Sequence, residues 1–283
     1  MKVIVTGARG QLGADVVRAL EQCGHTPIPA DREEFDITDA EQTQAFFLLH
    51  RPDAVIHCAA YTAVDKAESE ADICRQINTD GTGNIAAAAE SVGAKMLYIS
   101  TDYIYGGQGD TPLCEACPAS PLNVYGQTKY DGELAAQQCS RLFIVRTSWV
   151  FGLGGNNFIK TMLRLSQTHD TLRVVCDQVG SPTFTEDLAP LLCAMIATDK
   201  YGTYNASNEH FCSWYDFAET IFRKVGSPTK VVPVTTAEYG APAKRPLNSR
   251  LSKQKLFDNG FALLPTWEDA LDRFLAKYTV TLR

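Results

Sequence analysis

The sequence has no long hydrophobic run, no excess of basic residues and no even set of cysteines, and each absence excludes a class of protein. No stretch approaches the roughly 20 apolar residues that a transmembrane helix needs. The net charge of −7 over 283 residues argues against a general nucleic-acid-binding protein, which is usually basic. A nucleotide ligand stays compatible with this charge, because backbone N–H groups can hold a phosphate.

The start of the chain also lacks a secretory signal peptide, since the apolar run at residues 3–5 is short and glycine follows at once. Nine scattered cysteines, an odd number, indicate reduced thiols and not a disulfide framework. We therefore expect a cytoplasmic protein with no membrane segment and no nucleic-acid partner. Cys114 and Cys117 have the spacing of a redox or metal pair, but no second Cys or His cluster lies near them, so we interpret them as loop cysteines without an assigned role.

Short apolar or β-branched runs alternate with helical patterns through the first half of the chain. This alternation predicts an α/β fold with a Rossmann-like, doubly wound parallel sheet and right-handed crossovers. The predicted helices include residues 72–92 and the segment that carries Tyr125. The predicted strands cover residues 2–5, 26–30, 54–60, 95–100 and 142–147.

Beyond Phe151 the alternation loosens. We predict a dinucleotide-binding domain over residues 1–150, which also receives the region 180–207. Residues 151–283 are predicted to form mainly a smaller, partly interleaved lobe that binds the substrate. A Pro-rich and basic stretch at residues 241–248 is predicted to be a loop over the ligand.

A glycine-rich turn follows the first predicted strand and precedes a helical pattern. Its glycines are Gly7, Gly10 and Gly13, with Gln11 and Leu12 between the last two. A strand, a glycine turn and a helix in this order present helix N-terminal amides to a diphosphate. The first glycine allows the tight turn, the second lets the ligand approach the backbone, and the third lets the helix pack on the sheet. This stretch predicts a dinucleotide site.

The second predicted strand ends at Asp31 and Arg32, where a dinucleotide fold places its ribose-reading residue. Asp31 suits the free 2′-hydroxyl of NADH, and Arg32 suits the 2′-phosphate of NADPH. The sequence therefore leaves both cofactors as candidates. Asp36 and Ile37 follow and are expected at the adenine.

The third predicted strand ends in small residues. Ala59 and Ala60 would let a cofactor lie against the end of this strand, and Tyr61 follows them in the same predicted cofactor segment.

Tyr125 and Lys129 lie four residues apart, so a helix brings both side chains to one face. A cation beside a phenol stabilises phenolate, so we expect Lys129 to lower the pKa of Tyr125 from about 10 toward neutrality. A tyrosine of that kind can exchange a proton with a carbonyl or alcohol oxygen. The pair therefore predicts acid–base chemistry.

The glycine turn and the Tyr125–Lys129 stretch together resemble the extended short-chain dehydrogenase/reductases. Further segments, spread from the first strand to about Leu256, look like those of the dTDP-4-dehydrorhamnose reductases. These segments are Cys58–Glu68, Ile99–Tyr105, Arg146–Val150, Asp177–Thr183 and Arg245–Ser249.

The resemblance implies that a hydride passes from NADPH, with NADH as the alternative, to the C4 ketone of dTDP-4-dehydro-L-rhamnose, which gives dTDP-L-rhamnose. Tyr125 would protonate the developing C4 alkoxide. Lys129 would hold the nicotinamide ribose, and Thr101 would donate a hydrogen bond to the same C4 oxygen.

The resemblance also implies a substrate site. Asp102 would bind a sugar hydroxyl, and Thr62 and Val64 would touch the sugar. Trp149 offers a flat face to the thymine. Arg245 would meet the diphosphate through two N–H groups.

Tyr103 distinguishes the resembled reductases from two other kinds of enzyme in the same superfamily. The sugar-nucleotide 4,6-dehydratases carry a glutamate at the position of Tyr103, because they must eliminate water. The 4-epimerases carry a pattern of small residues there. The segment Thr101–Tyr103 therefore favours a reductase.

Some members of the resembled family bind a metal at a dimer interface through three carboxylates. Asp15 and Glu186 match two of these positions, but the stretch Ala276–Arg283 offers no third carboxylate. We therefore expect no required metal, and either a monomer or a homodimer.

Two other functions stay open. The chain would also suit a reductase of another 4-keto nucleotide sugar. A non-catalytic, NADP-binding regulatory subunit is the alternative from a different class, because the resembled family includes the regulatory subunit of methionine adenosyltransferase.

Overall fold

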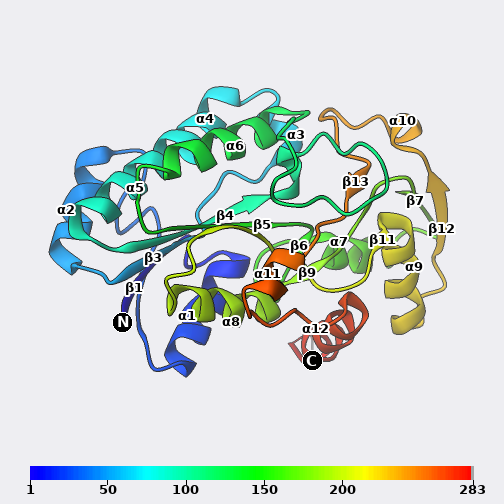
Figure 1. Ribbon diagram of the computed structural model, residues 1–283. Coiled ribbons are helices and arrows are strands. Elements are labelled where there is room, and N and C mark those ends of the chain that lie inside the picture. Colours follow the sequence, from blue (N-terminus) through cyan, green and yellow to red (C-terminus); the bar gives the residue numbers. More distant parts are fainter. Residues whose placement is uncertain (282–283) are drawn as a thin grey trace.

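Six parallel strands form the central sheet, in the order β10-β5-β4-β3-β1-β2 (Figure 1). This computed structural model describes residues 1–281. It confirms the predicted doubly wound parallel sheet. The strands are β1 (Lys2–Thr6), β2 (Thr26–Ala30), β3 (Ala54–His57), β4 (Lys95–Thr101), β5 (Leu142–Thr147) and β10 (Gly202–Asn205).

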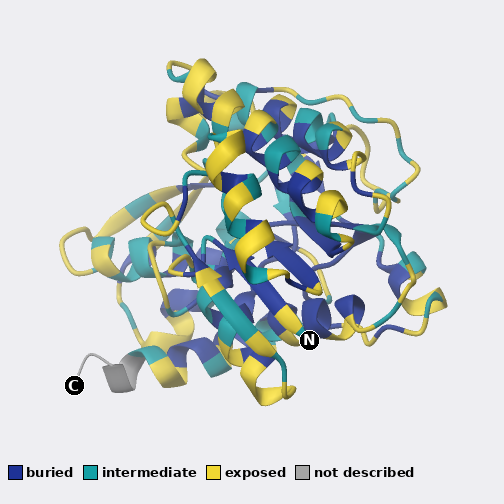
Figure 2. Cartoon of the chain, turned by 90° about the vertical axis from the view of Figure 1, so that its left-hand side faces the viewer, coloured by how far each residue is buried: buried dark blue, intermediate teal, exposed yellow. Residues whose placement is uncertain are grey.

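Helices cover both faces of this sheet (Figure 1). One face packs against α1 (Gln11–Gln22) and α8 (Thr185–Ile196). The other packs against α2 (Ala40–His50), α5 (Gly81–Val92) and α6 (Val124–Ala136). Because both faces are covered, the inner strands β1, β3, β4 and β5 are almost entirely buried, as Figure 2 shows for the centre of the molecule.

The first strand shows how the sequence specifies this arrangement. Val3 and Val5 belong to the core with α1 and α8, whereas Ile4 belongs to the core on the opposite face. All three are fully buried. Successive side chains of a strand point to opposite faces, so a continuous β-branched run is what a strand between two helical layers requires.

One predicted strand ends earlier than expected. The third strand stops at His57 and not at Ala60, because its neighbour β1 ends at Thr6, the last residue that pairs with it. The chain then turns away over the cavity described below.

The predicted helix 72–92 is wrong as a single element. It consists of α4 (Ala71–Arg75), a π-helical turn at Gln76–Asp80 and α5. Such π-helical insertions occur often at functional sites. Here the wider turn contains Asn78, a buried residue that binds a neighbouring loop.

A second group of elements packs around aromatic side chains. It contains α7 (Phe158–Leu165), α9 (Trp214–Val225) and α12 (Trp267–Thr281). Its buried aromatic residues include Phe151, Phe184, Phe217, Trp267 and Phe274. Short strand pairs border it, namely β6 (Val150–Phe151) with β9 (Thr183–Phe184), β7 (Thr171–Val175) with β12 (Lys230–Val234), and β8 (Val179–Gly180) with β11 (Cys212–Ser213) and β13 (Asn248–Ser249).

The chain crosses between the two groups more than once. After β7 it returns to the large sheet as α8 and β10, and it then goes back to the second group with α9. The remaining short helices are α3 (Val64–Ala67), η2 (Asp102–Ile104), α10 (Thr236–Tyr239) and α11 (Gln254–Asp258).

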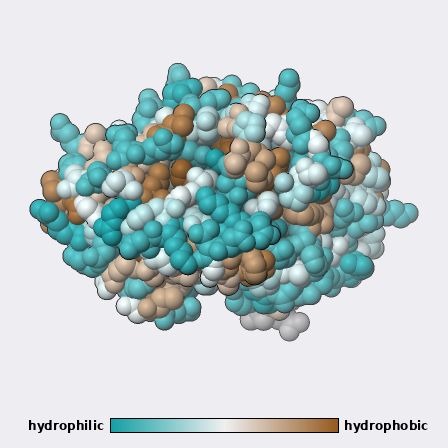
Figure 3. Space-filling model, in the orientation of Figure 1, coloured by the Kyte–Doolittle hydropathy of each residue, from teal (hydrophilic) through white to brown (hydrophobic). Residues whose placement is uncertain are grey.

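The outer surface is mainly polar. On the face shown in Figure 3, hydrophilic residues cover most of the area and hydrophobic ones form separate groups. Within residues 1–281, no helix combines the length and the apolar composition that crossing a bilayer demands.

Helix α1 approaches the backbone of the glycine turn closely at Gly13. A Cβ atom on Gly13 would lie 2.1 Å from the carbonyl oxygen of Gly7 and 2.8 Å from Cα of Ala8. Both neighbours are backbone, so they cannot rotate away. Helix α1 therefore packs directly on the turn, and it can do so because Gly13 has no side chain.

We expect Gly13→Ala to lower the free energy of unfolding by about 1–3 kcal/mol, because the added methyl group forces α1 off the turn. Gly83→Ala is the matched control. A Cβ there meets only side-chain atoms at 3.5 and 3.6 Å, and removing a helical glycine should stabilise by about 0.5–1 kcal/mol. Urea titration of both variants measures the difference, and equal effects would contradict this account of the turn.

Candidate active site

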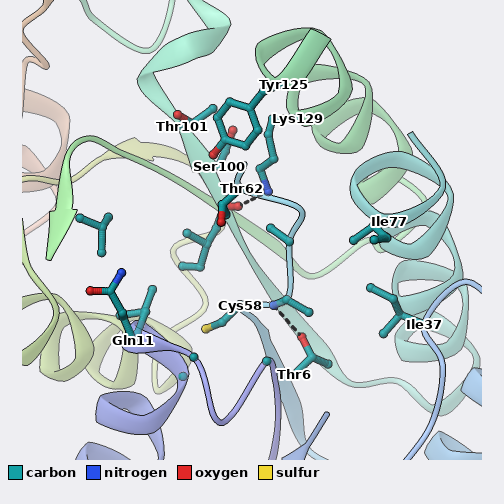
Figure 4. Close-up of a pocket in the computed structure, with 18 of the residues that line it drawn as sticks. Thr6, Gln11, Ile37, Cys58, Thr62, Ile77, Ser100, Thr101, Tyr125 and Lys129 are labelled. Carbon is teal, nitrogen blue, oxygen red and sulfur yellow. Dashed lines mark hydrogen bonds between the residues drawn. The ribbon is translucent and has the colours of Figure 1, made fainter. Parts of the chain in front are cut away.

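A cavity of about 910 Å³ lies at the carboxyl ends of the parallel strands (Figure 4). Strand-end residues Thr6, Thr101 and Thr147 contribute to its wall. Ligands of open α/β sheets bind at this edge. The volume is large enough for a dinucleotide together with part of a second ligand.

The cavity brings together nearly all of the predicted site residues. The two that do not line it are Tyr61 and Arg245. Those that do are Gly7, Gly10, Gln11, Leu12, Gly13, Asp31, Arg32, Asp36, Ile37, Ala59, Ala60, Thr62, Val64, Thr101, Asp102, Tyr125, Lys129 and Trp149.

The glycine turn presents free backbone donors to the cavity. Gly7 has a positive φ of 65°, and the N–H of Gly10 donates to the carbonyl oxygen of Gly7 at 2.9 Å. Helix α1 has neither a side-chain cap nor an acidic residue in its first turn. Within residues 1–281 no side chain therefore caps its N-terminal amides, which fits a bound diphosphate.

Gln11 connects this turn to the second group of elements. Its Oε1 atom accepts from the N–H of Gly152 at 3.1 Å and from Nδ2 of Asn157 at 3.0 Å. Asn157 in turn caps α7. The side chain thus holds the two walls of the cavity together, a role that its position in the glycine motif did not indicate.

The end of β2 carries the predicted ribose-reading residues. Oδ2 of Asp31 already accepts the backbone N–H of Arg9 at 3.0 Å. The Arg32 side chain is 88% exposed and pairs loosely with Asp36 at 3.4 Å. An exposed guanidinium can turn toward an added anion, so this edge suits a phosphate on the ribose. Ile37 and Ile77 lie together at the same end of the cavity (Figure 4).

Asn78 is a positioning residue that the sequence did not reveal. Its Oδ1 atom accepts from the N–H of Tyr61 at 2.8 Å, and its Nδ2 atom donates to the carbonyl oxygen of Tyr61 at 3.1 Å. Nδ2 also donates to Oγ1 of Thr128 at 3.2 Å. One buried amide therefore ties the loop after β3 to helix α6.

Helix α6 places Tyr125 and Lys129 on the same wall of the cavity, as predicted (Figure 4). Asn123 begins the helix by accepting the N–H of Gly126 at 2.7 Å. A Cβ on Gly126 would lie 2.3 Å from the carbonyl oxygen of Tyr103, so the helix starts in contact with η2. This contact sets the distance between Tyr125 and the end of β4.

The expectation that Lys129 lowers the pKa of Tyr125 is wrong. The ammonium group faces elsewhere: Nζ donates to the carbonyl oxygen of Ile99 at 2.7 Å and lies 4.1 Å from the centre of the Tyr98 ring. Tyr125 is half-buried and lines the cavity. That burial raises the pKa of Tyr125 well above 10, and a hydrogen bond with Thr101 offsets only part of the rise.

Burial has the opposite effect on Lys129. The side chain is almost fully buried, and the loss of hydration lowers the pKa of Lys129 to about 7, against a smaller raising effect of the Glu133 carboxylate. The lysine is therefore poised to change charge near neutrality, while the tyrosine stays protonated.

Thr101 ends strand β4 and Asp102 begins η2, beside Tyr125. The Thr101 hydroxyl accepts the N–H of Tyr103 at 3.2 Å and donates to Oδ1 of Asp102 at 3.0 Å. Among the residues that the structure describes, no well-formed hydrogen bond reaches Oδ2 of Asp102. Burial raises the pKa of Asp102 to about 6, and the neighbouring Ser249 hydroxyl counteracts this only in part.

A buried ion pair holds α6 on the sheet. Arg146 of β5 forms two hydrogen bonds with Glu133 of α6, at 2.8 and 2.7 Å. Ser100 donates to the same carboxylate at 2.6 Å. The Arg146 and Glu133 side chains are 8% and 4% exposed. With both charges and the hydroxyl satisfied, the pair locks the helix that carries Tyr125.

Trp149 has a partner that the sequence did not indicate. Its ring stacks on Trp214 of α9, with centroids 3.7 Å apart and an angle of 14°. Both rings line the cavity. Trp149 also has a positive φ of 49°, an unusual backbone for a bulky residue, so the local backbone is strained to present this ring.

Tyr61 and Arg245 lie outside the cavity lining. The Tyr61 hydroxyl donates to Glu70, and only its backbone is held near the cavity, by Asn78. Arg245 uses two N–H groups to bind Asp65, at 3.0 and 2.8 Å. The Arg245 guanidinium, predicted to bind a diphosphate, therefore binds a carboxylate. Its contact with the diphosphate stays a prediction.

The two carboxylates matched to metal ligands both pair with cations. Asp15 binds Arg18, and Glu186 binds Lys277. Among residues 1–281, no cluster of three or more His, Cys, Asp or Glu side chains is placed to hold a metal ion. Residues 282–283, the end of the stretch that lacks a third carboxylate, lie outside the described residues.

Comparisons with known proteins agree over nearly the whole chain. The family model described as "RmlD substrate binding domain" matches residues 1–280. The chain is 39% identical over 297 residues to the dTDP-4-dehydrorhamnose reductase of Escherichia coli (strain K12), covering 99% of each. It is 40% identical over 276 residues to the spore coat polysaccharide biosynthesis protein SpsK of Bacillus subtilis (strain 168), covering 97% of this chain and 96% of that protein.

A solved structure gives the same result. The crystal structure of dTDP-4-dehydrorhamnose reductase from Bacillus anthracis, in complex with NADP, matches with a TM-score of 0.95 and 44% identity. The match covers 98% of this chain and 99% of that one.

The buried lysine makes a prediction about stability. Because the pKa of Lys129 is about 7 in the folded chain and 10.5 in an unfolded one, the unfolded state binds more protons between these values. Stability therefore rises with pH across this window. Lys129→Met should remove that rise and increase the free energy of unfolding by roughly 1–4 kcal/mol at pH 7.

Denaturant titrations at several pH values between 7 and 10 test this prediction. The exposed Lys66 serves as the control, and Lys66→Met should leave both the stability and its pH dependence nearly unchanged. A Lys129→Met protein that is less stable than the wild type would show that the lysine contributes more through its contacts than burial costs.

Proposed function

The chain belongs to the family described by the RmlD substrate binding domain, and from this membership and the geometry of the cavity we propose that it reduces the C4 ketone of dTDP-4-dehydro-L-rhamnose to dTDP-L-rhamnose with NADPH. It is thus an oxidoreductase that acts on a nucleotide sugar. The observation that carries the proposal is the meeting of Tyr125, Thr101 and Lys129 at the strand ends of a cavity that begins at a glycine turn.

The residues of the cavity fit a dinucleotide. The glycine turn offers uncapped amides for the diphosphate, and Gly10 carries no side chain that would fill the space. Arg32 would hold a 2′-phosphate, which favours NADPH, although Asp31 leaves NADH as a possible second cofactor. NADPH, when bound, supplies the hydride. Lys129 would hold its ribose hydroxyls from α6.

Tyr125 would deliver the proton. An alkoxide that develops at C4 is strongly basic, so the donor must be protonated at neutral pH. The raised pKa of Tyr125 ensures this. Thr101, whose hydroxyl now binds Asp102, would turn toward the C4 oxygen and stabilise the charge that develops there.

Asp102 would bind a sugar hydroxyl. Its Oδ2 atom is buried and lacks a well-formed hydrogen bond within the described chain. A buried acceptor without a donor costs free energy. A substrate hydroxyl in the cavity would satisfy it, and Thr62 and Val64 would complete this wall.

Trp149 would stack on the thymine. One face of its ring is covered by Trp214, which leaves the other face for the base. Two stacked indoles make a rigid platform at low entropic cost. We keep Arg245 as a candidate for the diphosphate, provided that its pair with Asp65 opens.

Several further expectations rest on this proposal. All nine cysteines are free thiols, which supports a reducing compartment such as the cytoplasm. We propose that residues 1–150 with the region 180–207 hold the cofactor and that residues 151–283 mainly hold the substrate. The absence of a required metal, and a monomer or homodimer as the assembly, stay predictions.

The direct test is the oxidation of NADPH with dTDP-4-dehydro-L-rhamnose. Turnover with this sugar above that with other 4-keto nucleotide sugars supports the proposal. Preference for a different keto sugar would identify the alternative reductase. Tight NADPH binding without any turnover would favour a regulatory subunit.

Replacing the proton donor should affect kcat far more than cofactor binding. Tyr125→Phe is expected to reduce kcat by roughly 10²–10⁴-fold, because it removes the general acid. The Kd for NADPH should stay nearly unchanged. Tyr130→Phe on the same helix is the matched control and should keep wild-type kcat. Near-normal turnover of Tyr125→Phe would show that another group donates the proton.

Asp102 should determine how kcat/KM for the sugar depends on pH in the acidic range. Because its pKa is raised to about 6, the carboxylate takes up a proton as pH falls through 6, and its acceptor role is lost. We expect kcat/KM for the sugar, at saturating NADPH, to fall below pH 6. Asp102→Asn should abolish this acidic limb and lower kcat/KM at pH 7 roughly tenfold to a hundredfold. An unchanged acidic limb in the variant would assign it to another group.

A further inference from the structure

Cys114 and Cys117 lie outside the cavity and have no part in the proposed reduction. They begin and end a turn in the long segment between β4 and α6, closed by the N–H of Cys117 donating to the carbonyl oxygen of Cys114 at 3.0 Å. Their sulfur atoms are 3.1 Å apart. A turn of this kind keeps its end Cα atoms within about 7 Å, which is where a disulfide can close.

We propose that Cys114 and Cys117 form a reversible dithiol–disulfide site that exchanges with low-molecular-weight disulfides. Sulfur atoms 3.1 Å apart need to approach by only about 1 Å to reach the bonded distance. The side chains can do this by small rotations, without a change in the backbone of the turn.

The two thiols are not equivalent. Cys114 is exposed, whereas Cys117 is half-buried and packs against Ile104, Tyr105 and Leu251. The two sulfur atoms are within hydrogen-bond distance, and this contact, with nearby backbone N–H groups, lowers the pKa of Cys114. The same contact raises the pKa of Cys117. Cys114 is therefore the attacking sulfur and Cys117 the resolving one.

The exchange balances with oxidised glutathione as the oxidant. The Cys114 thiolate attacks one sulfur of glutathione disulfide, which forms a mixed disulfide and releases one glutathione thiolate. Cys117 then loses its proton to water and attacks Sγ of Cys114, which releases the second glutathione. The protein loses two protons and two electrons, and one glutathione disulfide becomes two thiols.

The surrounding contacts hold the turn in place. The Tyr105 hydroxyl donates to the carbonyl oxygen of Cys114 at 3.0 Å, and Nη1 of Arg146 donates to that of Glu115 at 3.0 Å. The Glu115 carboxylate accepts the N–H of Asn205 at 2.8 Å. The dithiol and the disulfide can therefore have the same backbone conformation in this turn. Because the closed ring is small, the bond adds little to folding stability and should be easily reduced.

The surroundings do not favour a metal. Thiolate zinc sites usually have four protein ligands. In the part of the chain that the structure describes, no third His, Cys, Asp or Glu joins the pair in a potential metal cluster. Two adjacent thiols without further ligands are better suited to thiol–disulfide exchange.

Redox titration of the full chain tests the proposal. The protein is equilibrated in buffers of oxidised and reduced glutathione, quenched with acid, alkylated with N-ethylmaleimide and digested with trypsin. Cleavage after Lys95 and Lys129 gives a peptide that contains only these two cysteines. We expect this peptide to change from doubly alkylated to unalkylated and lighter by two hydrogens, and dithiothreitol to reverse the change.

Single variants distinguish the two sulfurs. Cys117→Ser should accumulate a stable glutathione adduct on Cys114, because the resolving thiol is missing. Cys114→Ser should react at Cys117 at least tenfold more slowly. Cys23→Ser, which removes another exposed thiol, is the control and should form the disulfide like the wild type.

Two results would overturn the proposal. One is a peptide that stays doubly alkylated in glutathione disulfide alone. The other is glutathione adducts on both cysteines of the wild-type chain without an internal disulfide. Neither result bears on the reductase activity, so this inference and the proposed function fail separately.

Discussion

The buried pair between Arg146 and Glu133 is the interaction on which the rest of the site depends. It joins strand β5 to helix α6, and α6 carries both Tyr125 and Lys129. Arg146 also donates to the Tyr105 hydroxyl and to the carbonyl oxygen of Glu115, so one guanidinium anchors the proposed acid and the Cys114–Cys117 turn. A buried charge is costly unless its hydrogen-bonding groups are satisfied. Here the satisfied pair holds α6 in one position on the sheet.

Burial also explains the acid–base properties of the cavity. Loss of hydration disfavours charge, so it raises the pKa values of Tyr125 and Asp102 and lowers that of Lys129. A reductase that must protonate an alkoxide benefits from a tyrosine that stays neutral. At pH 7 the shifts of Asp102 and Lys129 reduce the stability of the folded chain, and the cavity keeps these groups because a ligand, and not the protein, is to satisfy them.

The cavity itself forms because different parts of the chain end at one edge. Parallel strands place Thr101 beside Thr147 and end β1 with Thr6 at the same edge. Gln11 joins the glycine turn to the second group of elements. Asn78 holds the loop after β3 against α6. Hydrogen bonds between residues far apart in the chain therefore set the width of the site, while the strands set its position.

The sequence by itself determined the parallel sheet, the glycine turn and the Tyr125–Lys129 helix face, because these depend on local patterns of two to seven residues. It also placed most of the cavity lining, since strand ends in such sheets converge. Only the tertiary structure decided the π-helical turn, the Trp149–Trp214 stack and the pairing of Arg245 with Asp65. It also reversed the expected pKa shift of Tyr125. Contacts between distant segments and the loss of water on burial produce these features, and neither leaves a trace in local sequence.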